Sequence, residues 1–198
     1  MPRYNIDMLL SEPFETYHAE SAKHLSSHQL LDFMRTPLLY QKKRMGLIAD
    51  QDSTAFMVGR AAHTRILEGR EAYESRYAIG GPINPATGRP YGTATKKYAE
   101  WIATQTQPVI PTEKAGLIES MNLGVRRNPY ATEILTKGVA EGVLRTVYCE
   151  FSSQIRIDWF SPTFGIVDLK TCDDLDWFEN DVHRYSYVHQ QAFYTKPT

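Results

Sequence analysis

Apolar residues recur at helical spacing along most of the first 140 positions. Ser26 precedes an apolar run that begins at Leu30, and Gln29 stands three residues after Ser26, which is typical of a capped helix start. Pro37 is expected to end or interrupt this helix. Further helices are predicted over 54–69, 95–106, 112–127 and 130–137, and a long loop rich in Gly and Pro is predicted over 79–95.

The pattern becomes strand-like from Val143 onward. Three segments, 143–151, 154–159 and 166–171, are β-branched or alternate between apolar and polar residues, and a turn over 161–165 joins the last two. They predict a three-strand antiparallel meander, after which the tail returns to helical spacing over 177–194. Because no linker or internal repeat is visible, we expect one α+β domain over 1–198, with 1–25 as a loose lead-in.

Composition narrows the class of protein. The 198 residues include 22 Lys and Arg and 23 Asp and Glu, which gives a net charge of −1. This charge excludes a protein that binds nucleic acid through a high overall positive charge. Two cysteines are too few for a disulfide scaffold or a four-cysteine zinc site. No apolar run approaches a membrane span, and no signal-peptide core is present, so we expect a cytoplasmic protein without membrane contact.

Two aspartates stand on neighbouring strands of the meander. If the turn is centred on Thr163, Asp158 faces Asp168 and Arg156 faces Lys170, with the two carboxylates about 5 Å apart at Cβ. Like charges at that distance destabilise a sheet unless a proton or a cation lies between them. Oxygen ligands favour Mg²⁺ or Mn²⁺, and a lysine beside them can orient an attacking water.

Each of these residues also fits a plainer role. Asp158, Asp168 and Lys170 fit the solvated face of an amphipathic hairpin equally well. His63 lies on the apolar side of its helix, where a histidine is more often part of the core than a ligand. A stripe in the last helix, of which Gln190 is one member, fits simple packing.

Four features, taken together in chain order, resemble a known superfamily. They are GRAAH at 59–63, Asp158, VDLKT at 167–171 and YVHQQAFY at 187–194. This set resembles the PD-(D/E)XK nucleases, with their restriction-endonuclease-like α+β core, in the branch that has a His–Asp–Asp–Lys site and a terminal Gln-x-x-x-Tyr motif. Within that branch the chain is most similar to phage and prophage exonucleases of the RecE (exonuclease VIII) type, related in chemistry to the RecB nuclease domain and lambda exonuclease. The resemblance covers nearly the whole chain.

The resemblance implies a divalent-metal centre. It assigns one or two Mg²⁺ ions, or Mn²⁺ in their place, to His63, Asp158 and Asp168, and it assigns Lys170 to the attacking water.

Further roles follow from the same resemblance. Gln190 and Tyr194 are expected to support the site and to contact the substrate strand. An acidic residue of the first strand sometimes joins such sites; Glu141 is favoured here, with Glu150 as the other candidate.

The implied activity is a 5′→3′ exonuclease that digests linear double-stranded DNA to mononucleotides and leaves a 3′ single-stranded tail for recombination. The alternatives are a structure-specific or single-strand endonuclease on the same core, or a non-catalytic DNA-binding recombination module. The implied partners are duplex DNA ends and a single-strand annealing protein, and the implied assembly is a ring-forming homo-oligomer. Relatives continue into more sheet and helix after the last motif, so the chain ending at Thr198 is either a minimal version or a truncated one.

Basic residues are the candidates for contacts with the DNA backbone, because phosphate contacts dominate affinity without reading sequence. Each cluster fits a solvated surface as well. The candidates are Arg89, Arg156, Lys42, Lys43, Arg44, Lys96, Lys97, Arg126 and Arg127.

Overall fold

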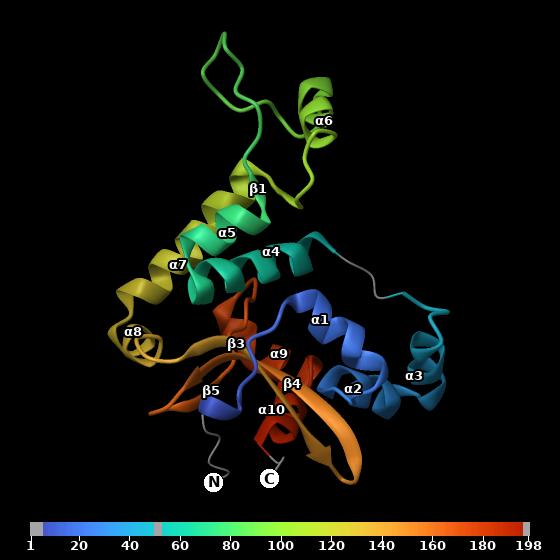
Figure 1. Ribbon diagram of the computed structural model, residues 1–198. Helices are drawn as coiled ribbons and strands as arrows, with labels where there is room; N and C mark the ends of the chain where they lie inside the picture. Colours follow the sequence, from blue (N-terminus) through green and yellow to red (C-terminus); the bar gives the residue numbers. More distant parts are fainter. Residues whose placement is uncertain (1–5, 50–52, 196–198) are drawn as a thin grey trace. The chain divides into compact units, whose positions relative to one another are not determined.

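The computed structural model describes residues 6–49 and 53–195 (Figure 1), and its chain divides into two compact units. Unit 1 comprises Met1–Gln51 and Lys137–Thr198, and unit 2 comprises Asp52–Thr136. The single domain over 1–198 that the sequence predicts stays a prediction. Each unit buries apolar residues of its own, such as Ile155 in unit 1 and Ile118 in unit 2.

The predicted α+β class is confirmed by the elements of both units. Unit 1 holds η1 (Ile6–Met8), α1 (Phe14–Ala19), η2 (Glu20–Ala22), α2 (Ser27–Arg35), α3 (Pro37–Arg44), β3 (Val139–Tyr148), β4 (Phe151–Ser161), β5 (Gly165–Val167), η4 (Leu175–Trp177), α9 (Phe178–Arg184) and α10 (Tyr187–Thr195). Unit 2 holds α4 (Thr54–His63), the π-helical turn η3 (Thr64–Glu68), α5 (Arg70–Arg76), β1 (Ala78–Ile79), α6 (Lys96–Ile102), β2 (Val109–Ile110), α7 (Thr112–Arg127) and α8 (Pro129–Ile134).

The sheet of unit 1 is the predicted antiparallel meander, in the order β3-β4-β5. The prediction that the first strand runs to position 151 is wrong, because Cys149 and Glu150 form the hairpin turn. Both adopt left-handed backbone conformations, with φ of 48° and 70°. A two-residue hairpin loop favours such conformations, and neither residue is the glycine that marks this turn in a sequence.

The register between β4 and β5 is the predicted one. Trp159 pairs with Val167 and Ser161 with Gly165, so the turn is centred on Thr163. The strand β5 nevertheless ends at Val167, and Asp168 lies just beyond the ladder.

The segment 6–25, expected to be a loose lead-in, pairs with two open edges of the sheet. Leu10 exchanges backbone hydrogen bonds of 2.8 and 2.9 Å with Val143 on the outer edge of β3. Leu25 lies beside the part of β4 that β5 does not reach, where its backbone bonds Ser152 and Gln154. Unpaired strand edges carry unsatisfied backbone groups, which explains why this segment is ordered against the sheet.

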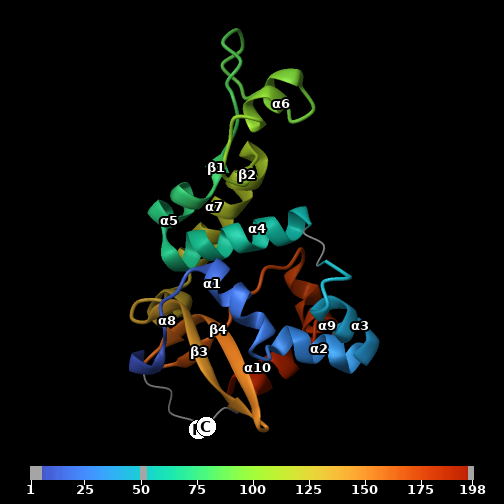
Figure 2. The ribbon, with the colours of Figure 1, turned by 45° about the vertical axis from the view of Figure 1, so that its right-hand side comes forward.

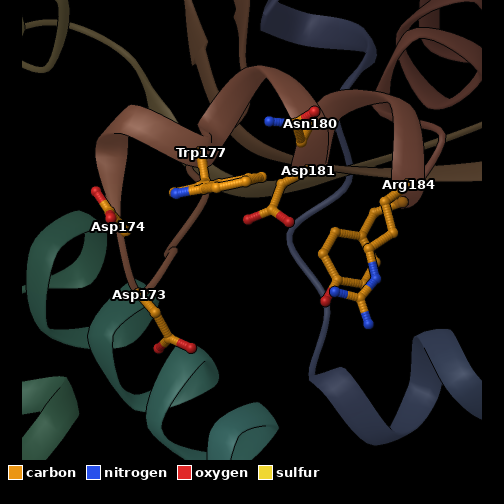
Figure 3. A pocket seen from close by; sticks show the side chains of 7 residues that line it. Asp173, Asp174, Trp177, Asn180, Asp181 and Arg184 are labelled. Atoms are coloured by element: carbon orange, nitrogen blue, oxygen red, sulfur yellow. The ribbon is translucent and has the colours of Figure 1, made fainter.

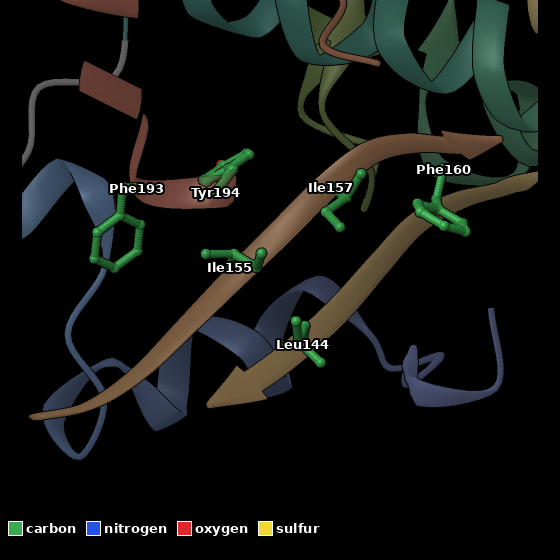
Figure 4. Close-up of a cluster of buried hydrophobic side chains, with 6 residues drawn as sticks. All are labelled: Leu144, Ile155, Ile157, Phe160, Phe193 and Tyr194. Atoms are coloured by element: carbon green, nitrogen blue, oxygen red, sulfur yellow. The ribbon is translucent and has the colours of Figure 1, made fainter. Parts of the chain in front are cut away.

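The core of unit 1 lies between the sheet and the last helix (Figure 4). It consists of Leu144, Ile155, Ile157, Phe160, Phe193 and Tyr194. The 177–194 segment was predicted as one helix, but Ser186, with φ of 58°, separates α9 from α10. Phe193 and Tyr194 thereby fix α10 to the strands that carry the acidic residues.

Unit 2 packs α4 and η3 against α7. The predicted 54–69 helix is confirmed over 54–63; it continues as a π-helical turn and stops at Gly69, whose φ of 97° suits glycine. Arg65 of η3 donates twice to Glu119 of α7, at 2.7 and 2.9 Å. Within this unit the loop between β1 and α6 projects away from α4 (Figures 1 and 2). No helix within the described ranges 6–49 and 53–195 is long and apolar enough to cross a membrane.

Candidate active site

Glu141 and Asp158 face each other across β3 and β4. The pairs on either side, Ala140 with Trp159 and Gly142 with Ile157, place the two acidic residues at matching register positions. A carboxylate oxygen of Glu141 lies within 4.8 Å of one of Asp158. Glu141 has a φ of 55°, a backbone conformation that non-glycine residues rarely adopt and that clusters at functional sites.

Asp158 is the electrostatic centre of this group. Burial, the Asp168 carboxylate and, more weakly, Glu141 raise its pKa from 3.8 to about 8, against the lowering effect of Lys170. Its Oδ2 accepts a hydrogen bond of 2.8 Å from the backbone N–H of Leu169. Each acidic neighbour therefore disfavours the ionised form of Asp158, and a bound cation would favour it.

Lys170 pairs with Asp168. Its Nζ lies 2.8 Å from Asp168 Oδ1, and it also stands 5.0 Å from the centre of the Tyr187 ring. The prediction that Lys170 faces Arg156 is wrong, because β5 ends before these positions and Arg156 pairs with Glu141 instead. The ammonium group is thus held beside one of the carboxylates, between Asp168 and an aromatic face.

Gln190 and Tyr194 lie on α10 and contact each other, with Gln190 Nε2 donating to Tyr194 Oη at 3.1 Å. Burial raises the pKa of the Tyr194 hydroxyl, with Asp158 and Asp168 adding to that effect. Tyr194 also belongs to the core cluster. The pair therefore joins the core of unit 1 to the acidic group on the strands.

The other candidate acid of the first strand, Glu150, stands in the exposed β3–β4 turn, at the opposite end of the hairpin from Asp158. Glu141 is therefore the first-strand acid that the fold brings to the site. Sequence spacing could not separate the two, because the position of the turn decides between them.

His63 is the last residue of α4 and is half-buried within the chain. The π-helical turn η3 follows it directly. Such turns are frequent at functional sites in proteins. His63 belongs to unit 2, whereas the acidic residues belong to unit 1, so its place among the metal ligands remains a proposal.

The predicted DNA-contacting residues fall into several environments. Arg156 is only 13% exposed in its ion pair with Glu141, so it is not part of the open surface. Lys43 pairs with Asp32 on α2, and Arg44 donates to the Tyr40 hydroxyl. The remaining candidates are exposed: Lys42 on α3, Arg89 in the projecting loop, Lys96 and Lys97 on α6, and Arg126 and Arg127 on α7.

A surface hollow of about 580 Å³ is lined by residues that follow Lys170 closely in the sequence (Figure 3). Its lining is Asp173, Asp174, Trp177, Asn180, Asp181, Arg184 and Tyr185. Three carboxylates against one guanidinium disfavour a phosphate backbone at this place. No motif or spacing in the sequence marks the residues of this hollow as a site.

The donor set of the strand residues fits a hard divalent cation. Glu141, Asp158 and Asp168 offer carboxylate oxygens, the ligands that Mg²⁺ and Mn²⁺ prefer. Burial raises the pKa of Asp158, the Asp168 and Glu141 carboxylates add to this effect, and a cation bound beside them would favour the ionised form.

An α+β unit that carries acidic residues beside a lysine on and next to its strands is typical of the PD-(D/E)XK class of nuclease-type folds. The chain belongs to the family described as PDDEXK-like domain of unknown function (DUF3799), whose profile matches residues 26–197. No curated protein matches the chain. The family match confirms the superfamily predicted from the four motifs, and this superfamily is one of nucleases that generally depend on divalent metals.

Proposed function

We propose that the chain is a divalent-metal-dependent deoxyribonuclease that digests linear double-stranded DNA from its ends in the 5′→3′ direction, similar to RecE-type exonucleases. The observation that carries the proposal is the placement of Asp158 opposite Glu141, with Asp168 and its partner Lys170 directly beyond the strand. Opposed carboxylates with an adjacent lysine suit hydrolysis of a phosphodiester better than a purely structural sheet end.

In this proposal the carboxylates of Glu141, Asp158 and Asp168, together with His63, would hold one or two Mg²⁺ ions. A bound divalent cation lowers the pKa of water and stabilises the charge that develops on the leaving oxygen. Lys170 orients the attacking water and offsets negative charge on the phosphate, and Asp168 keeps the ammonium group in place.

Gln190 and Tyr194 support this site from α10. Tyr194 packs in the core and accepts a hydrogen bond from Gln190, so the pair can fix α10, the helix whose Tyr187 ring lies against Lys170. Tyr194 is 5% exposed, which favours a supporting role for it and leaves contact with the substrate strand to Gln190.

The exposed basic residues are the proposed contacts with the DNA backbone, chiefly Lys42, Arg89, Lys96 and Lys97. The net charge of −1 gives little attraction at long range. Continuous digestion would therefore depend on an enclosing assembly, and we propose a ring of identical chains acting beside a single-strand annealing protein.

End-labelled DNA tests this proposal. We expect the purified chain with Mg²⁺ to release mononucleotides from the 5′ ends of a linear duplex and to leave a covalently closed circle intact. Lys170→Ala should lower the rate by about 10²-fold or more, because removal of one preorganised charge at a reacting phosphate typically costs this much.

Lys137→Ala, a change at a lysine outside the site, is the matched control and should retain the rate. Cleavage of the closed circle would identify an endonuclease instead. Binding of DNA without any metal-dependent release of nucleotides would identify a non-catalytic module and contradict the proposal.

A further inference from the structure

Arg156 stands two positions before Asp158 on β4, and its guanidinium is held next to the acidic group. Its Nε donates to Glu141 Oε2 at 2.5 Å. Its Nη1 is buried and has no hydrogen-bond partner among the described residues. A buried donor without an acceptor costs free energy, so other contacts must retain the guanidinium in this position.

The aromatic rings of α1 provide those contacts. The Arg156 Cζ lies 5.4 Å from the centre of the Phe14 ring and 5.9 Å from that of Tyr17. A guanidinium over an aromatic face is attracted by the ring quadrupole, more strongly where water is excluded. Gln154 Nε2 also donates to the Tyr17 backbone oxygen at 2.9 Å, which fastens α1 to the same strand.

Glu141 needs such a constraint. Its φ of 55° is unfavourable for a residue with a side chain, and a strained backbone persists only where its surroundings fix it. The ion pair with Arg156 is one such constraint, and it acts on the carboxylate that faces Asp158. The contacts thus form one chain, from the rings of α1 through Arg156 to Glu141.

We propose that Phe14 and Tyr17 are positioning residues: through Arg156 they hold the Glu141 carboxylate where it binds the divalent cation. The proposal rests on the proposed function, because it places Glu141 in that metal site. Both aromatic residues precede position 26, where the part of the chain matched by the family model begins. In this proposal the N-terminal segment positions a metal ligand and also pairs with the open edges of the sheet.

Titration of the full chain with MnCl₂, followed by calorimetry without DNA, tests this inference. Arg156→Lys keeps the charge but loses the planar fork, and it should weaken Mn²⁺ binding by about 10- to 100-fold, as loss of a residue that orients a metal ligand commonly does. Phe14→Ala should weaken Mn²⁺ binding in the same direction. Phe14→Tyr and Tyr17→Phe retain the rings and should bind Mn²⁺ within about twofold of wild type.

A second readout separates positioning from stability. In the cleavage assay the Mg²⁺ concentration for half-maximal rate should rise in Arg156→Lys, while the rate at saturating Mg²⁺ recovers toward wild type. Leu30→Ala, which removes packing against the core cluster, is the matched control: it should lower the melting temperature and leave Mn²⁺ affinity unchanged.

Unchanged Mn²⁺ affinity in folded Arg156→Lys and Phe14→Ala would overturn the inference, and so would unchanged affinity in Glu141→Gln. These outcomes differ from a failure of the proposed function. If the variants shift Mn²⁺ binding as expected but the wild-type chain cleaves no DNA, the nuclease proposal fails while the positioning role stands.

Discussion

At the scale of single residues, the site is a balance of charge around Asp158. Two of its acidic neighbours have cationic partners, Lys170 for Asp168 and Arg156 for Glu141. Asp158 itself accepts a backbone hydrogen bond from Leu169, which offsets only part of its burial. Keeping this carboxylate ionised in the folded chain therefore costs free energy, and the raised pKa of Asp158 expresses that cost.

That cost predicts a dependence of stability on pH. The folded-state pKa of Asp158 is raised to about 8, so between its ordinary value and pH 8 the folded chain binds this proton more tightly than the unfolded chain. The resulting stabilisation is fully present at low pH and is lost as pH rises through about 8. Asp158→Asn mimics the protonated form, so without metal its melting temperature should exceed that of wild type increasingly as pH rises.

Thermal unfolding in EDTA at a series of pH values measures this difference. Asp173→Asn, an exposed acid outside the strands, is the control and should track wild type throughout. A difference between Asp158→Asn and wild type that stays constant with pH would contradict the assignment of the raised pKa.

At the scale of elements, local signals were predictable and long-range pairings were not. The capping box of Ser26 and Gln29 forms as predicted, because both partners lie within one helical turn. The register of β4 with β5 also followed from the turn at Thr163. The pairing of Leu10 with Val143 joins residues far apart in sequence, and no local pattern specifies it.

The capping box gives a prediction for α2. Ser26→Ala removes the side-chain acceptor for the Gln29 backbone N–H and should lower the free energy of unfolding by about 1 kcal/mol. Denaturant unfolding measures the change, and Ser26→Asp, which restores an acceptor, should recover most of it. Equal stability of Ser26→Ala and wild type would show that this cap contributes nothing to the fold.

At the scale of the whole molecule, the sequence predicts the acidic residues and the lysine of the candidate site. It does not predict the side chains that contact them. Asp158, Asp168 and Lys170 have a recognisable spacing in the sequence: Asp158 lies on β4, and the other two lie directly after β5. The sequence spacing does not predict the ion pair of Arg156 with Glu141, because the position of the Arg156 guanidinium also depends on its contact with α1. Nor did composition reveal that residues 52–136 form a unit of their own.

The two-unit organisation makes the role of His63 testable. If this histidine of unit 2 completes the metal site of unit 1, His63→Ala should weaken Mn²⁺ binding by about 10-fold or more, in line with loss of one ligand. It should also reduce the rise in melting temperature that Mn²⁺ produces in wild type. His24→Ala, at a histidine outside the candidate site, is the control. Mn²⁺ affinity equal to wild type in His63→Ala would exclude the histidine from the metal site.

The central claim is that the carboxylates of Asp158 on β4 and of Asp168 directly after β5 make the chain a metal-dependent nuclease. The most direct measurement is the release of nucleotides from linear duplex DNA with Mg²⁺ and with EDTA, by wild type, Asp168→Asn and the control Asp173→Asn. We predict release by wild type and Asp173→Asn with Mg²⁺ alone, and a loss of about 10²-fold or more in Asp168→Asn. Release in EDTA, or equal rates in folded Asp168→Asn and wild type, would contradict the claim.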